Sequence, residues 1–563
     1  MFDSADKNNE INGGIHMHEI NEIVERHGKA YHIVYKEKKY INLTVDVCEP
    51  DGFLYHAWEE CIGSGTAYLY ITDEKDYAGQ IVAQLKDVHE NLGFKRVYFD
   101  KINAYEPYIT TYSEDENGKG VYHWEQVDAV YDRILATGVK PFVMISAMPK
   151  ALASDPGNTA FDGGNSSAPK DYQKWKEYCK GFISHLIERY GHMEVSSWYV
   201  QIFNEPDIGN FYWSGTHEEF FMTYDYAATG IKEACENIKV GPGGFAFIHG
   251  HLLAAFIDHV TSFNYDIEGS LSGAPFDFIN GHGYLKQSFR DEFERLNKYM
   301  VSHFGPNHEK DLIISEWNAG GVPHTRDGAY NAAYIVKQVI SCSADFFSDP
   351  DKTRFFSFWT HSDIFDELGE IRSEFPDYYG LITRSGIRKA GYNAFKMLHK
   401  LGSSRIQITG GNGVVDGIAT YNKGEIAVLI YNCEHDELRV EGDESLDRLI
   451  NLSISNVPWP KVRIEHYRID NGHSNSFKVW KDMGSPDNCT VDQLELLSSR
   501  MDLEMLLQPY EYDTKDGMVE ASFMLAMPGV SMLCIQTVEN EFIRPHQENA
   551  AGMQDMMKFL MGK

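Results

Sequence analysis

Short apolar runs alternate with longer amphipathic stretches over residues 53–400 of this 563-residue chain. The apolar runs have the length and the β-branched and aromatic content of buried strands, whereas residues 78–91, 124–137, 172–190 and 218–237 have the period of amphipathic helices. Eight runs qualify as strands: one near residues 53–62, then 96–99, 141–146, 198–203, 239–241, 276–280, 312–315 and 355–359.

This alternation predicts a parallel sheet, and eight strand–helix repeats over roughly 350 residues predict a (β/α)8 TIM barrel. A doubly wound open sheet is the competing arrangement. It is disfavoured because no Gly-x-Gly-x-x-Gly motif follows the first strand. The predicted fold class is therefore α/β, with the barrel over residues 53–400.

The pattern changes after Leu401, where glycines become frequent and regular helical periods end. Closely spaced strand-like runs follow, at residues 418–421, 425–431, 461–468, 521–525 and 531–538. This spacing predicts a β-sandwich over residues 401–545, appended to the barrel. Residues 15–52 contain β-branched and aromatic runs that we expect to join the sandwich. We expect a disordered start at 1–14 and a tail at 546–563 with a short amphipathic helix.

Composition and charge narrow the class of partners. The formal net charge of −32 argues against a nucleic acid, whose phosphates require a basic surface. The eight cysteines include no Cys-x-x-Cys pair, which disfavours a zinc site and fits a reducing compartment. The polar N-terminus resembles no secretory signal, and no apolar run approaches about 18 residues. We expect a cytoplasmic protein without membrane contact, metal or cofactor, and a homo-oligomer is compatible with the sequence.

Two predicted strands end in a glutamate. In Ile202-Phe203-Asn204-Glu205-Pro206 the strand ends at Glu205, and Pro206 predicts an extended backbone there. In Ile313-Ile314-Ser315-Glu316-Trp317 an apolar run again ends in a glutamate beside an aromatic residue. Reactive groups of a barrel lie at the C-terminal ends of its strands, so both carboxylates are predicted to face one cleft.

A pair of carboxylates across a cleft is what the cleavage of a glycosidic bond requires. One protonates the leaving oxygen, and the other attacks the anomeric carbon or activates a water molecule. A separation of about 5–5.5 Å favours the retaining mechanism, and about 6.5–9.5 Å favours the inverting one. In such a pair Glu205 would need a raised pKa as the acid, while Glu316 would have to stay ionised.

Several stretches together resemble glycoside hydrolase family 39, the family of β-xylosidases and α-L-iduronidases. They extend over about residues 53 to 510 and include residues 58–65, 170–191, 204–206, 315–318, 358–367 and 466–475. The resemblance implies a (β/α)8 barrel with an accessory sandwich and a retaining mechanism. It also implies that Glu205 is the general acid/base and Glu316 the nucleophile.

The resemblance implies roles for further positions. Asn204 would bind the 2-hydroxyl of the sugar, and Tyr284 would donate a hydrogen bond to the nucleophile. His282 would lie in the sugar site, and Trp359 would form an apolar platform under the sugar ring. Glu367 would accept hydrogen bonds from sugar hydroxyls.

The chain departs from the family pattern around the predicted sugar site. Asp100-Lys101 stands where the β-xylosidases typically have His-Gly, and Asp100 is therefore a candidate sugar ligand with a different charge. Gln201, Phe203 and Asp207 replace the Glu, Trp and Asn that are usual in the family. These changes do not include Glu205 or Glu316. The resemblance therefore supports the class of reaction more strongly than the identity of the sugar.

The sequence therefore predicts a retaining exo-glycosidase, with a β-xylosidase acting on xylosides or short xylo-oligosaccharides as the first choice. A retaining glycosidase for another sugar, such as an arabinopyranoside, is the alternative that Asp100 suggests. A carbohydrate-binding protein with a degenerate site is the alternative from another class, and the presence of both glutamates argues against it.

Overall fold

The computed structural model describes residues 22–26, 29–33, 39–161, 163–248, 250–262, 274–284, 288–320, 322–349, 354–369, 373–422, 424–436 and 439–538. The predicted disordered start and the predicted C-terminal tail lie outside these residues. Two short strands near the N-terminus, β1 (Glu22–Arg26) and β2 (Lys29–Ile33), pair with each other.

Eight parallel strands form the barrel, in the order β12-β11-β10-β5-β4-β15-β14-β13. The ring closes between β12 and β13, where Phe245 bridges to Gly281 and accepts a hydrogen bond from the His282 N–H at 2.8 Å. In chain order the strands are β4 (Cys61–Gly63), β5 (Arg96–Tyr98), β10 (Lys140–Ile145), β11 (Tyr199–Asn204), β12 (Lys239–Gly244), β13 (Phe278–Tyr284), β14 (Asp311–Asn318) and β15 (Arg354–Phe358).

A helix follows each barrel strand and covers the outside of the ring. Their starts match local capping chemistry: the Asp171 side chain accepts from two backbone N–H groups at the start of α3, and Thr216 and Glu219 form a capping box on α5. The helices are α1 (Tyr77–Leu92), α2 (Glu125–Leu135), α3 (Tyr172–Tyr190), α5 (His217–Ala234), α6 (His251–Thr261), α7 (Phe289–Phe304), α8 (Ala329–Ser343) and α9 (Ala390–His399), with the single turn α4 (His192–Val195) after α3.

Two barrel strands differ from the sequence prediction. The first is β4, because the run near 53–62 divides into the end of an accessory strand at Phe53 and the barrel strand from Cys61. The sixth continues past residue 280 to Tyr284. Gly283 does not end it as a turn: a Cβ there would lie 2.1 Å from the Phe289 ring, so the glycine serves close packing inside the strand.

The accessory part is a nine-stranded mixed sheet in the order β21-β20-β23-β18-β17-β16-β3-β19-β22. It is mixed because β3 and β19 pair in parallel while the other pairs are antiparallel. Its strands are β3 (Tyr40–Phe53), β16 (Ser404–Thr409), β17 (Val415–Asn422), β18 (Glu425–Asn432), β19 (Arg448–Ser455), β20 (Lys461–Ile469), β21 (Glu504–Asp513), β22 (Val519–Leu525) and β23 (Gly529–Thr537).

Both faces of the central strand β18 are buried. Leu429 and its alternate neighbours belong to the large core shared with the barrel, whereas Val428 belongs to a second core within the sheet. That second core also contains Leu43 of β3 and Leu452 of β19, from the other half of the sheet, so the sheet curves around it. A sandwich of two separate sheets, as expected from the sequence, is not confirmed.

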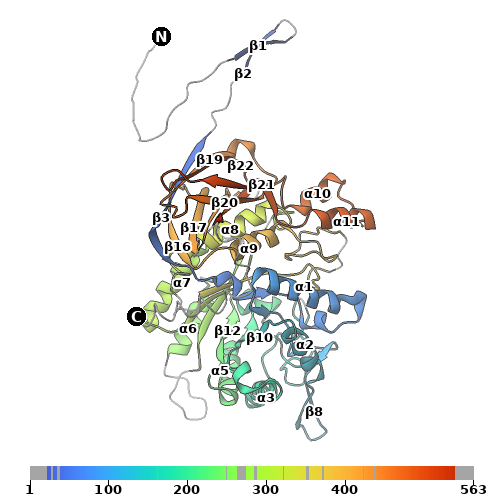
Figure 1. Ribbon diagram of the computed structural model, residues 1–563. Helices are drawn as coiled ribbons and strands as arrows, with labels where there is room; N and C mark the ends of the chain where they lie inside the picture. Colours follow the sequence, from blue (N-terminus) through green and yellow to red (C-terminus); the bar gives the residue numbers. More distant parts are fainter. Residues whose placement is uncertain are drawn as a thin grey trace, which may run out of the picture.

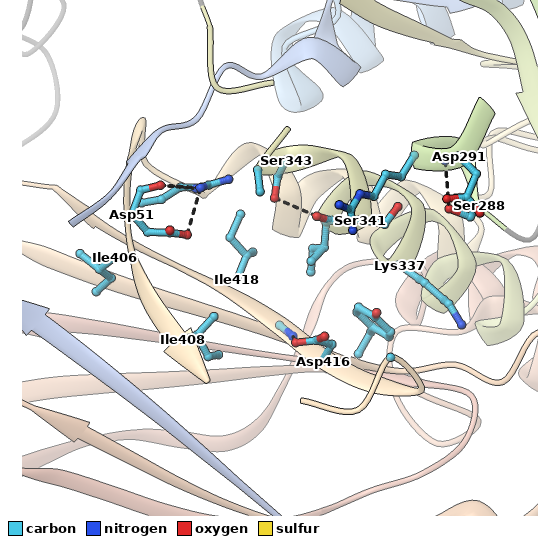
Figure 2. A pocket seen from close by; sticks show the side chains of 17 residues that line it. Asp51, Ser288, Asp291, Lys337, Ser341, Ser343, Ile406, Ile408, Asp416 and Ile418 are labelled. Carbon is cyan, nitrogen blue, oxygen red and sulfur yellow. Dashed lines mark hydrogen bonds and ion pairs between the residues drawn. The ribbon is translucent and has the colours of Figure 1, made fainter. Parts of the chain in front are cut away.

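The barrel and the sheet pack side by side, with α8 and α9 lying against the sheet (Figure 1). A cavity of about 420 Å³ lies between α7, α8 and strands β16 to β18, with Lys337 and Asp416 in its lining (Figure 2). None of the predicted site residues lines it.

Short elements complete the described chain. Two hairpins, β6 (Ala104–Tyr105) with β7 (Ile109–Thr110) and β8 (Tyr112–Glu114) with β9 (Gly120–Tyr122), follow strand β5, and α10 (Ser476–Asp482) and α11 (Val491–Ser499) lie between β20 and β21. Within the described ranges, no helix has both the length and the apolar character needed to cross a membrane.

Candidate active site

Glu205 lies directly after the C-terminal end of β11. Its N–H donates to the Gly244 carbonyl at 2.9 Å, so the backbone stays tied to β12 through this residue. The extended conformation predicted from Pro206 is wrong: Glu205 has φ 38° and ψ 53°, in the left-handed region. The chain turns here from a strand into the 3₁₀ helix Pro206–Phe211, and this turn outweighs the usual preference before proline. Such backbone strain is typical of functional sites.

The structure brings Glu205, His282, Tyr284 and Glu316 together at the ends of β11, β13 and β14. His282 Nδ1 lies 2.7 Å from Glu205 Oε1 and 3.4 Å from Glu316 Oε2. The Tyr284 hydroxyl donates to Glu316 Oε2 at 2.9 Å. Oxygen atoms of the two glutamates lie within 4.8 Å of each other. One imidazole therefore links the two carboxylates, and one phenol binds the second of them.

Burial dominates the electrostatics of this group. It raises the pKa of Glu316 to about 8, and the negative charge of Glu205 adds to the rise, while His282 and the Tyr284 hydroxyl oppose it. Burial lowers the pKa of His282, but the charges of Glu316 and Glu205 outweigh burial and raise it above its ordinary value. The raised pKa of Glu316 differs from the expectation that this carboxyl stays ionised, because burial outweighs His282 and the Tyr284 hydrogen bond.

A buried polar layer lies beneath the two glutamates. Gln201 exchanges hydrogen bonds with the Tyr98 hydroxyl at 2.8 and 3.0 Å, and it accepts one from the Asn280 amide, which also reaches Ser315. The Tyr98 hydroxyl also lies 3.4 Å from the Asn204 side-chain oxygen. The layer orients Asn204, which is buried at the end of β11 beside Glu205.

Asp100 is buried after β5, and its charge acts on Glu316 to raise the pKa of that group. The side chain of Lys101 is also buried, and its ammonium lies 3.0 Å from Asp100 Oδ2. Asp100 Oδ1 accepts from the Lys101 N–H and from the Ser146 hydroxyl. Lys101 therefore offsets the charge of Asp100 rather than pointing into solvent.

Trp359 follows the end of β15, and only 4% of it is exposed. Its ring lies edge-on to Tyr98 and Phe365, with centroids 5.9 Å away in both cases. A Cβ added to Gly63, at the end of β4, would lie 2.2 Å from this ring. The missing side chain at Gly63 therefore determines where the indole can lie.

Glu367 lies farther along the same loop and is half-buried. It acts on Tyr379, a residue that sequence analysis missed. Burial raises the pKa of Tyr379, and the charges of Glu367, Glu316 and Glu205 add to this, which places the phenol near both predicted catalytic carboxylates. The Arg326 guanidinium lies 4.2 Å from the centre of its ring. The only sequence signal for Tyr379 is the Tyr378-Tyr379-Gly380 run after the eighth strand. Tyrosine runs are common in protein cores, so this signal does not indicate a functional site.

The family model for glycosyl hydrolases family 39 matches residues 41–505, most of the chain. The chain belongs to glycosyl hydrolase family 39. It is thus a glycoside hydrolase, and relatives that match it along most of their length support this.

A β-xylosidase from Caldicellulosiruptor saccharolyticus is 29% identical over 489 residues, covering 83% of this chain and 93% of the relative. A β-xylosidase from Geobacillus stearothermophilus is 29% identical over 508 residues, covering 86% and 93%. The crystal structure of a monomeric β-xylosidase from Caulobacter crescentus CB15 superposes with a TM-score of 0.73, at 22% identity, covering 88% of this chain and 100% of that one. This last likeness concerns the fold, and it supports the TIM barrel.

Within the described residues, Glu205, His282 and Glu316 are the group of side chains that could hold a metal ion. The imidazole nitrogen that faces both carboxylates already lies at hydrogen-bond distance from Glu205. The other nitrogen points at Gly244, where an added Cβ would lie 2.2 Å away. The arrangement of these family 39 residues therefore fits hydrogen bonding between His282 and the carboxylates better than a metal centre.

We predict that Gly63→Ala displaces the Trp359 ring and lowers kcat/KM by about 100-fold, since a misplacement near 1 Å can cost that much. Steady-state kinetics and intrinsic tryptophan fluorescence measure the two effects. Gly118→Ala is the control, because it adds a Cβ with nothing within 4 Å, although its φ of 73° adds backbone strain. Full activity in Gly63→Ala would contradict this role of the glycine.

Proposed function

We propose that the protein is a retaining exo-β-xylosidase, with Glu205 as general acid/base and Glu316 as nucleophile. The observation that carries the proposal is the approach of the two carboxylates, whose oxygens lie within 4.8 Å of each other. An inverting enzyme needs about 6.5–9.5 Å between the carboxyl groups to admit a water molecule, whereas a retaining enzyme has about 5–5.5 Å. The short separation supports direct attack by one carboxylate on the anomeric carbon.

The hydrogen bonding and exposure of the two glutamates support these different roles, while burial of Glu316 opposes its ionised form. Glu316 receives the Tyr284 hydrogen bond, which stabilises its ionised form and orients one oxygen, leaving the other for attack. Glu205 is the more exposed, at 15% against 8%, and it begins the segment that leaves β11 at the barrel mouth, as a proton donor to the leaving group requires. His282 bonds to Glu205 and, as a cation between the two, would hold the proton of the pair in place.

The remaining predicted residues would bind the sugar. Asn204, beside the acid/base, would reach the 2-hydroxyl, where a hydrogen bond strengthens in the transition state. Trp359 would support the ring from below, and Asp100 and Glu367 would accept hydrogen bonds from hydroxyls. Two relatives named as β-xylosidases support xylose as the sugar released.

A glycosidase for another sugar is the second candidate. The observation that favours it is the buried Asp100–Lys101 ion pair, which brings a charged acceptor and a cation to the end of β5. A charged acceptor binds hydroxyls strongly, and its position selects their configuration.

We expect Glu316→Ala to lose turnover on every glycoside. Glu205→Ala should lose about 10²–10⁴-fold on substrates with poor leaving groups, the usual contribution of a general acid, and far less on dinitrophenyl glycosides. Azide should restore the rate of Glu205→Ala by forming a glycosyl azide. Rates near wild type on xylobiose in either variant, or a first product with inverted anomeric configuration by NMR, would contradict the proposal.

The pH dependence follows from the raised pKa of Glu316. As the proposed nucleophile Glu316 must be ionised, so kcat/KM should fall as the pH drops through about 8, the value to which burial raises its pKa. In Glu205→Gln the like charge is gone, so the pKa of Glu316 should fall. With a dinitrophenyl glycoside the acid limb of this variant should shift to lower pH. An unchanged profile would contradict the coupling.

A panel of nitrophenyl glycosides separates the two candidate sugars. We expect the β-D-xylopyranoside to have the highest kcat/KM. Asp100→Asn should change the ratio of kcat/KM for the xyloside to that for the arabinopyranoside. It should have a smaller effect on the initial burst of nitrophenol that accompanies formation of the Glu316 glycosyl-enzyme. A panel led by an arabinopyranoside or a hexoside would favour the second candidate, with the same catalytic pair.

A further inference from the structure

Three phenylalanine side chains are exposed on the surface of the described chain. Within the described part of the chain, the large apolar side chains classed as exposed include Phe161, Phe211 and Phe247 and no other phenylalanine, with exposed fractions of 63%, 55% and 57%. Exposed apolar side chains scattered singly need no explanation, but a group of them marks a binding surface.

These phenylalanines come from one sector of the barrel mouth. Phe161 lies on the loop after β10, Phe211 on the loop after β11, and Phe247 on the loop after β12. The three strands are neighbours in the barrel. All three side chains therefore lie on the face where the C-terminal strand ends place the two glutamates, and Phe211 ends the 3₁₀ helix that begins right after Glu205.

Hydrogen bonds and ring contacts join the three loops. The Phe161 and Phe211 rings have centroids 5.7 Å apart, and the Phe161 N–H donates to the Phe211 carbonyl at 2.9 Å. The Asp207 carboxylate accepts from the N–H groups of Ala246 and Phe247 at 2.9 and 2.8 Å. The segment that carries Glu205 is thus bonded to the loop on each side.

The position of the general acid determines what this surface can face. An acid/base residue must reach the oxygen of the leaving group, so the leaving group extends over the segment that carries it. A second sugar could stack on an aromatic face, as proposed for Trp359, but it would also need hydrogen-bond partners for its hydroxyls, which phenyl rings do not supply. Three phenyl rings offer flat apolar faces without a polar group, and this favours another aromatic ring.

We propose that the phenylalanine platform, Phe161, Phe211 and Phe247, binds an apolar aromatic leaving group, so that the substrates are aryl glycosides in preference to xylo-oligosaccharides. The inference rests on the proposed function, because it takes Glu205 as the acid that faces the leaving group. It assigns the substrate class on the side of the cleaved bond opposite the sugar.

The test compares two glycosides of the same sugar whose leaving groups have matched acidity, one a phenol and the other a fluorinated alcohol. Phe211→Ala should lower kcat/KM for the aryl glycoside roughly tenfold, the loss expected when a ring no longer packs on the platform. The alkyl glycoside should change less than twofold. Phe211→Leu keeps most of the side-chain volume and should lose part of the preference for the aryl over the alkyl glycoside. This variant replaces Phe211→Ala in the test if the alanine variant folds poorly.

Tyr40→Ala is the matched control, an aromatic residue 47% exposed on β3 of the accessory sheet, and it should change neither rate. Equal losses on both glycosides, or no loss, would overturn the inference while leaving the proposed function standing. So would a dimer of the wild type, seen by light scattering, that Phe211→Ala dissociates without altering selectivity. A wild type that hydrolyses no glycoside would overturn both.

Discussion

The imidazole of His282 between the partly buried carboxylate of Glu205 and the buried carboxylate of Glu316 is the interaction on which the site depends. Two carboxylates at this separation repel each other, and burial strengthens the repulsion because little water screens it. The raised pKa values of His282 and Glu316 relieve it, because they favour a cation between the carboxylates and a proton on Glu316. At the end of β5 the negative charge of Asp100 is likewise offset, here by the ammonium group of Lys101. Acidic groups can gather at the barrel mouth only because each has a bound cation or a donor.

These groups can approach one another closely only because glycines on neighbouring strands leave space for them. Gly244 leaves space for His282, and Gly63 leaves space for Trp359. Both glycines end barrel strands whose neighbours carry reactive groups. A (β/α)8 barrel brings eight strand ends to one small mouth, so a large residue at one end displaces the group on the next. The geometry of the carboxylates therefore depends on residues without chemistry of their own.

The sequence predicted the parts of this protein that periodicity and strand-end chemistry determine. The eight-stranded barrel follows from alternation alone, and Glu205 and Glu316 from their places after apolar runs. The left-handed backbone of Glu205 could not be predicted, because a hydrogen bond to Gly244 on another strand opposes the local effect of Pro206. The curved nine-stranded sheet depends on pairing between β3 and strands some 400 positions later, such as β19, which no local pattern encodes.

The residues proposed for chemistry and those proposed for specificity lie on different structural elements. The hydrogen-bonded set around Glu316 lies on strands β13 and β14, which are buried except at Tyr284. The platform phenylalanines lie on loops, exposed and joined by a few backbone bonds, so they can change without altering the distance between the carboxylates. Asp100 lies between these extremes, since it is buried but follows the shortest type of barrel strand, the three-residue β5. If the proposed roles hold, the catalytic pair can be retained while the sugar and the leaving group vary, because separate parts of the barrel mouth would recognise them.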